Sequence, residues 1–152
     1  MAFSDTMAKE LQRFVKEQEH GMQKYSTALA EIKNGHKENH WIWYIFPQLA
    51  GLSTGGMSEQ FAITDFDEAK AYLQHDLLGQ RLVEISTALL GLATNNANEV
   101  FGKQEDVNKL QSSMTLFSLV PNASPVFQAI LDKYFSGRQD ERTIKLLGQQ
   151  NK

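Results

Sequence analysis

The most regular stretch of this chain is Asp76-Leu-Leu-Gly-Gln-Arg-Leu-Val-Glu-Ile-Ser-Thr-Ala-Leu-Leu-Gly-Leu92. Its aliphatic side chains recur at steps of four and three residues, at Leu78, Leu82, Ile85, Leu89 and Leu92. Because an α-helix completes a turn about every 3.6 residues, this spacing places all of them along one stripe. We therefore predict a core helix over about Asp76–Leu92, and this helix decides the fold class.

Helical spacing of apolar residues continues on both sides of this stretch. Further helices are predicted around Met7–Phe14, around Met22–Ile32, from the capping box Asp65–Glu68 to Gln74, from Asn96 to Phe101, over Val107–Phe117, over Val126–Ser136, and after Asp140. No alternating strand pattern and no internal repeat competes with them. The prediction is an all-α fold, a single multihelical domain of seven or eight helices over residues 1–152 with frayed ends. We expect helices packed at mixed angles and not a simple four-helix bundle.

Length and composition fit a globular protein with one core. The chain has 152 residues, of which 41% are hydrophobic and 22% are charged, and only three are prolines. This balance is typical of a folded domain and not of a disordered segment. The net charge of −3 lacks the basic surplus of a nucleic-acid-binding protein, so nucleic acid is not expected as a partner.

Several other classes of protein are disfavoured by what the sequence lacks. With no cysteine, disulfides, thiolate catalysis and cysteine-based metal sites are excluded. The first ten residues do not resemble a signal peptide, and no apolar run approaches the roughly 20 residues of a membrane span. We therefore expect a cytoplasmic protein with no membrane partner.

The block Asn39-His-Trp-Ile-Trp-Tyr-Ile-Phe-Pro-Gln48 contains both tryptophans of the chain. It is apolar whether it is read as a strand or as a helix, so both readings bury it. Pro47 disfavours a helical conformation at Phe46, and we predict a short helix from Asn39 to about Ile45 followed by a turn. The glycine-rich stretch 49–57 is either a mobile lid or a simple turn before Ser58 caps a short helix. The sequence favours the turn.

Four residues of this block are candidates for ligand binding, and each has a structural alternative. His40 is of the residue type whose unperturbed pKa lies near neutral pH, but a hydrogen-bonded core or capping role is favoured. Trp41 and Trp43 could stack on a planar ligand, although packing in the core is the favoured role. Gln48 follows Pro47 and could bind either backbone or ligand through its amide.

A second group of candidates lies on the predicted helix over 107–117. Asp106, Lys109 and Ser113 are spaced to share one helical face, and Ser112 stands beside it. A lysine near a serine could activate a nucleophile or bind an anion. The alternative, favoured over covalent catalysis, is that Lys109 pairs with Asp106 and that the hydroxyls bind carbonyls one turn earlier.

No metal or cofactor is predicted. Only His36 and His40 stand four residues apart, and they straddle a predicted helix boundary. Asp140 and Thr143 read as a helix N-cap.

Several segments resemble a known family. They are the run Gly35–Leu52 with its His-Trp-x-Trp-x-x-Phe-Pro-Gln pattern, Glu68–His75, Leu78–Leu82, Phe101-Gly102, Lys109–Phe117 and Asp140-x-x-Thr143. In order and spacing they are similar to the family catalogued as domain of unknown function 1810. The resemblance implies a multihelical fold and does not imply an established activity. Some relatives carry the label calpastatin, but calpastatin-type inhibitors are disordered and repetitive, unlike this chain.

Two functional hypotheses follow from these candidates. In the first, His40, Trp41, Trp43 and Gln48 form one wall of a pocket for a small anionic or nucleotide-like ligand, and Lys109, Ser112 and Ser113 form the opposite wall. In the second, the chain is a non-catalytic interaction or structural module with the aromatic block as its core. The two differ in whether His40 and Lys109 open into one cleft. Catalysis and oligomeric state are left open.

Overall fold

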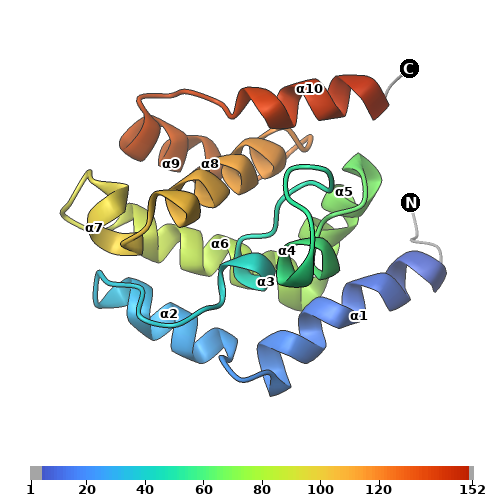
Figure 1. Ribbon diagram of the computed structural model, residues 1–152, viewed down its shortest axis with the longest axis horizontal. Helices are drawn as coiled ribbons and strands as arrows, with labels where there is room; N and C mark the ends of the chain where they lie inside the picture. The colour runs from blue at the N-terminus through green and yellow to red at the C-terminus, as the bar shows by residue number, and fades with distance from the viewer. Residues whose placement is uncertain (1–4, 151–152) are drawn as a thin grey trace.

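The computed structural model describes residues 5–150 and is helical throughout (Figure 1). Within these residues the helices are α1 (Asp5–His20), α2 (Tyr25–Lys33), α3 (Ile42–Ile45), α4 (Gly56–Gln60), α5 (Phe66–Gln74), α6 (Asp76–Leu90), α7 (Ala97–Phe101), α8 (Gln104–Ser118), α9 (Val126–Phe135) and α10 (Glu141–Gln150). The predicted all-α fold is confirmed. The number of helices is roughly consistent with the prediction, since α3, α4 and α7 have only four or five residues each. The predicted fraying of the chain ends falls on residues outside the described range.

Helices α6 and α8 form the centre of the molecule. In Figure 1, α10 runs beside α8 along one edge, and α1 and α2 lie along the opposite edge. Helix α9 packs against both α6 and α8, while α5 bridges the same two helices. These helices surround one hydrophobic core instead of lying in parallel as a four-helix bundle.

The predicted core stripe is present on α6. Leu78, Leu82, Ile85 and Leu89 are buried, whereas Leu92 lies beyond the helix and is half-buried. The helix ends at Leu90 because side chains of α9 take up its last carbonyl groups. Lys133 Nζ donates to the carbonyl oxygens of Leu90 and Leu92, and the Tyr134 hydroxyl donates to the carbonyl of Leu89 at 2.6 Å.

The predicted helix caps at Asp65 and Asp140 are confirmed, and His75 forms a further cap. The Asp65 carboxylate accepts a hydrogen bond from the backbone N–H of Glu68 at 2.9 Å. His75 Nδ1 accepts from the first amides of α6, and Asp140 Oδ2 accepts from the N–H of Thr143 at 3.1 Å. Each cap satisfies amide groups that have no partner within their helix.

Two local predictions were wrong. Met22 was expected on the buried face of a helix, but α2 begins only at Tyr25, and Met22 is 95% exposed in the preceding bend. Ser58 was expected to cap a short helix, but α4 begins at Gly56 and so includes Ser58. Gly55 precedes α4 with a φ angle of +79°, a conformation that glycine adopts without strain, so the helix starts earlier than the serine suggested.

Candidate functional site

The aromatic block is anchored to the buried carboxylate of Glu31 on α2. Glu31 Oε1 accepts hydrogen bonds from Trp41 Nε1 at 2.9 Å and from the backbone N–H groups of Glu38 and Asn39 at 2.7 and 3.0 Å. Its Oε2 atom accepts from Asn39 Nδ2 at 2.6 Å. Burial alone would raise the pKa of this carboxyl, but the hydrogen bonds outweigh burial and lower the pKa below its usual value. We call this arrangement the Glu31 hub.

Trp41 belongs to the hydrophobic core. It is fully buried, and its ring packs against Phe46 and Phe101 at centroid distances of 6.3 and 6.5 Å. On another side, Lys37 Nζ lies 5.2 Å from the ring centroid and forms an ion pair with Asp106 Oδ2 at 2.9 Å. Asp106 is therefore paired with Lys37 and not with Lys109, its expected partner on the same helix.

A polar cleft of about 400 Å³ lies between α8, the start of α10 and the loop that follows the aromatic block. We call it the α8–α10 cleft. The loop contributes Gln48, Leu52 and Ser53, and α10 with its cap contributes Asp140 and Arg142. The floor comes from α8, with Glu105, Asn108, Lys109, Gln111 and Ser112.

The loop wall of the cleft is held by backbone contacts. The carbonyl of Gln48 accepts from the N–H of Ile63 at 2.8 Å, and the N–H of Ala50 donates to the carbonyl of Ile63 at the same distance. Further along, Arg142 Nη2 donates to the carbonyl of Leu52 at 2.6 Å. The loop thus lies against α10, and the stretch predicted as either a lid or a turn borders the cleft.

The opposite wall is held by Asp140, which joins the start of α10 to α8. Its Oδ2 atom accepts from Ser112 Oγ at 3.0 Å and from Thr143 Oγ1 at 2.6 Å. Its backbone N–H donates to Thr115 Oγ1 at 2.8 Å. The Ser112 hydroxyl also lies 3.0 Å from the carbonyl oxygen of Asn108, one turn earlier, as the structural alternative predicted.

Lys109 is the cleft cation whose charge is not used by the fold. Its side chain is half-buried, and within residues 7–150 its ammonium group has no hydrogen-bond or ion-pair partner. The side-chain amide of Gln48, also half-buried, likewise makes no hydrogen bond to the described residues. A cation and an amide that the protein leaves unpaired can both contact a bound molecule.

Ser113 does not take part in the cleft. It is fully buried, and its Oγ atom has no hydrogen-bond partner among the described residues. No hydrogen bond joins Lys109 to either Ser112 or Ser113 in this part of the chain. The geometry therefore gives no support to a serine nucleophile activated by Lys109.

The structure brings together only part of the predicted site. Gln48, Lys109 and Ser112 line one cleft, whereas His40, Trp41, Trp43 and Ser113 are not among the residues that line it. His40 is exposed and Trp43 is half-buried. His40 and Lys109 thus do not open into the same cleft.

Arg142, Asp140 and Glu105 line the cleft but were not predicted as site residues. The sequence carried a signal for one of them, because Asp140-x-x-Thr143 is among the segments that resemble the family. The motif was not assigned to a site because its role as a helix N-cap explains both residues. Arg142 and Glu105 stood in no motif, and only the packing of α10 on α8 brings them to the cleft.

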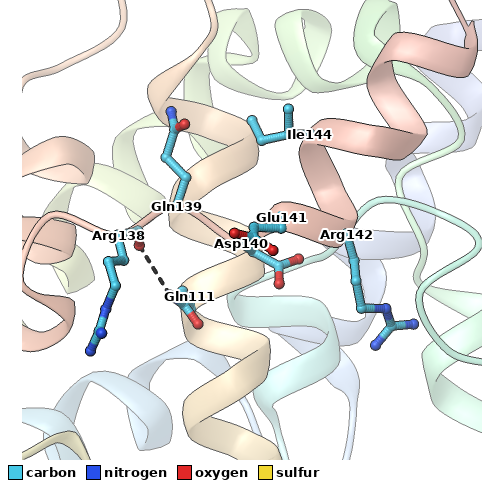
Figure 2. A pocket seen from close by; sticks show the side chains of 7 residues that line it. All are labelled: Gln111, Arg138, Gln139, Asp140, Glu141, Arg142 and Ile144. Atoms are coloured by element: carbon cyan, nitrogen blue, oxygen red, sulfur yellow. Dashed lines mark hydrogen bonds between the residues drawn. The ribbon is translucent and has the colours of Figure 1, made fainter.

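A second hollow, of about 620 Å³, adjoins the cleft and shares Gln111, Asp140 and Arg142 with it (Figure 2). In Figure 2 the guanidinium groups of Arg138 and Arg142 lie on opposite sides of Gln111. Gln111 is held in place because its Nε2 atom donates to the carbonyl of Arg138 at 3.0 Å. The two hollows therefore meet at Gln111 of α8 and at the start of α10.

Two further classes of site were searched for within residues 5–150. No three His, Asp or Glu side chains in this range gather closely enough to hold a metal ion. None of the helices in the same range is both long and apolar enough to cross a bilayer.

These features define a class of protein, namely a small multihelical domain with a polar cleft beside its central helix. Residues 8–147 match the model of the family described as protein of unknown function (DUF1810), and the chain belongs to this family. No curated protein matches the chain.

Among solved structures, the chain is similar to the conserved hypothetical protein Rv1873 from Mycobacterium tuberculosis. The two share 41% sequence identity, and the match covers 91% of this chain and 96% of that protein. The TM-score of 0.85 shows that both have the same fold. The calpastatin label has no counterpart in either comparison.

Proposed function

We propose that the protein binds a small anionic molecule in the α8–α10 cleft, with phosphorylated compounds, nucleotides among them, as the preferred class. The observation that carries the proposal is the unpaired ammonium group of Lys109 in a cleft that also contains Gln48 and Arg142. Two cations and a neutral amide that converge from separate segments are suited to an anion.

The carboxylates in the cleft do not oppose this proposal. Asp140 Oδ2 is occupied by the hydroxyl groups of Ser112 and Thr143 and by the N–H of Thr143. Glu105 is exposed at the rim, where water and salt screen its charge. Because Asp140 is engaged by the fold and Glu105 is exposed, Lys109 is a half-buried charge of the cleft that can contact an anion directly.

The proposal concerns binding and includes no covalent step. The Ser112 hydroxyl is shared between the carbonyl of Asn108 and the Asp140 carboxylate. That carboxylate already accepts other hydrogen bonds from Thr143, so it is not free to act as a general base. Whether the bound molecule reacts stays open. Cytoplasmic location, expected from the sequence, is part of the proposal and can be checked by cell fractionation.

The experiment is calorimetric titration of the purified protein with inorganic phosphate at low salt. A charged hydrogen bond contributes about 1.5–3 kcal/mol, so Lys109→Ala should weaken binding by about 10-fold or more. The control is Lys9→Ala, which makes the same change in net charge at an exposed position of α1. Gln48→Ala should weaken binding by roughly fivefold, because it removes a neutral donor.

Equal binding by Lys109→Ala and the unchanged protein would contradict the proposal, as would the absence of any binding at millimolar phosphate. The second result would favour a non-catalytic interaction or structural module. The burial of Trp41, Tyr44 and Phe46 in the core is compatible with that alternative.

A further inference from the structure

A third cleft, of about 500 Å³, lies among α7, α8 and the end of α9. Its lining includes Asn95, Asn96, Asn98, Gln104, Asn108 and Gln111. Asn and Gln make up 21 of the 152 residues of the chain but six of the eleven residues of this lining. We call it the carboxamide cleft, and its composition is far from that of an average surface.

Three of the carboxamide groups are oriented by hydrogen bonds to one another. Asn98 Nδ2 donates to Gln104 Oε1 at 3.2 Å, and Gln104 Nε2 donates to Asn108 Oδ1 at 2.8 Å. These bonds link α7 to α8 and leave each NH₂ group with a second hydrogen to donate. A row of oriented amides is thereby presented to the cleft.

The remainder of the lining adds one cation, two aromatic residues and two small aliphatic residues, namely Arg138, Tyr134, Phe135, Ala97 and Val107. Arg138 is the charged residue of the lining, which contains no carboxylate. Burial raises the pKa of Tyr134 to about 12, and its protonated hydroxyl donates to the carbonyl of Leu89 at 2.6 Å. Because that hydroxyl is used by the fold, Tyr134 offers the cleft the apolar surface of its ring.

This chemistry matches a polyhydroxylated molecule. A carboxamide is uncharged and carries both a donor and an acceptor, as does each hydroxyl group of a sugar. An amine would need carboxylates, and an aliphatic ligand would need apolar walls. A ring face together with donors and acceptors suits a sugar, which has an apolar C–H face and a polar rim.

The carboxamide cleft and the α8–α10 cleft share Asn108 and Gln111. Lys109 follows Asn108 on α8, so the unpaired cation is next in sequence to a carboxamide residue that lines both clefts. We infer that the ligand is a sugar phosphate, with its phosphate at Lys109 and its hydroxyl groups on the carboxamides. This inference rests on the proposed function, because it takes the anion site at Lys109 as its starting point.

The test compares ligands that carry one or both parts. Calorimetry is done with inorganic phosphate, glucose, and three hexose phosphates, namely glucose 6-phosphate, glucose 1-phosphate and fructose 6-phosphate. At least one hexose phosphate should bind about tenfold more tightly than phosphate, as expected from two neutral hydrogen bonds. Glucose alone should bind more weakly than that hexose phosphate.

The variant Asn98→Ala/Gln104→Ala removes amides that line the carboxamide cleft but not the α8–α10 cleft. It should bind the hexose phosphate no more tightly than phosphate, with its phosphate affinity unchanged. The control is Gln74→Ala/Gln80→Ala, which removes two exposed amides on α5 and α6 that line neither cleft and should change nothing.

Two results would overturn the inference while leaving the proposed function intact. In the first, phosphate binds through Lys109 but none of the hexose phosphates binds more tightly. In the second, a tighter hexose phosphate keeps its advantage in Asn98→Ala/Gln104→Ala. If phosphate itself does not bind, the proposed function fails, and the inference fails with it.

Discussion

The Glu31 hub and the α8–α10 cleft both gather polar groups, but they use them in opposite ways. In the hub one buried carboxylate accepts four hydrogen bonds, all of them from residues 38–41, the segment that it anchors. In the cleft, the half-buried side chains of Lys109 and Gln48 make no hydrogen bond or ion pair within the described residues. The comparison teaches that a polar group satisfied by the fold maintains structure, whereas a cluster left unpaired is available to a ligand.

The largest effect is expected in the aromatic block. Trp41→Ala removes a fully buried indole and should lower the free energy of unfolding by about 3–5 kcal/mol. Urea denaturation followed by circular dichroism measures it. A loss of unfolding free energy below about 1 kcal/mol would mean that the aromatic block does not stabilise the core. The contrast between a structural hub and a free cleft would then not hold.

The hub itself is tested by Glu31→Gln. The amide can still accept hydrogen bonds through its oxygen, but its NH₂ group faces other donors, so the free energy of unfolding at pH 7 should fall by about 1–3 kcal/mol. Glu38→Gln is the control, because its side chain is exposed and only its backbone binds the hub.

We expect the destabilisation caused by Glu31→Gln to depend on pH. The pKa of Glu31 is lowered in the folded protein, whereas in the unfolded chain it should be near the ordinary value of about 4.3. The stabilisation is thus complete above about pH 4.3 and is lost as the pH falls through the lower folded pKa. The difference in unfolding free energy between the unchanged protein and Glu31→Gln should shrink on acidification. A difference that stays constant from pH 7 to pH 3 would contradict the role of the carboxylate charge.

Adjacent serines on α8 give a smaller and more selective test. Ser113→Ala removes a buried hydroxyl without a partner among the described residues, so the free energy of unfolding should stay the same or rise by up to about 1 kcal/mol. Ser112→Ala removes the hydroxyl that contacts Asp140 and should lower the free energy of unfolding by about 1 kcal/mol. Thermal and urea denaturation of the pair measure both. The reverse order of stabilities would show that Ser113 has a structural partner and that Ser112 does not.

The smallest effect on stability is expected at the cleft. Lys109→Met keeps the aliphatic length of the side chain but removes a charge that the fold does not use, so the free energy of unfolding should change by less than about 0.5 kcal/mol. Denaturation in urea is the measurement. A loss as large as that of Glu31→Gln would show that Lys109 serves the fold, and it would remove the main support for a ligand site.

Much of the fold could be predicted because its determinants are local. The stripe from Leu78 to Leu89 and the caps at Asp65 and Asp140 follow from residues within a few positions of one another. The prediction for Met22 was wrong because helical spacing does not show where a helix begins. Its step of three from Tyr25 fits the stripe, although the helix starts only at Tyr25.

The candidate site was harder to predict because its partners are distant in sequence. Glu31 looks like a surface acid at the end of a helix, and no local pattern shows that it accepts from the indole of Trp41. Asp106 was expected to pair with Lys109. It forms an ion pair with Lys37 instead, and this leaves Lys109 unpaired. Gln48, Lys109 and Ser112 could be selected from their residue types, but their assembly with Arg142 depends on helix packing.

The hydrogen bond from Arg142 to the carbonyl of Leu52 joins two residues that lie 90 positions apart. Helix α10 also packs on α8, so the α8–α10 cleft has both walls only when these two distant contacts are made. The contacts of α6 with α5 and α9, by contrast, do not involve α10. Partial unfolding that releases α10 would therefore open the cleft while leaving the centre of the core in place.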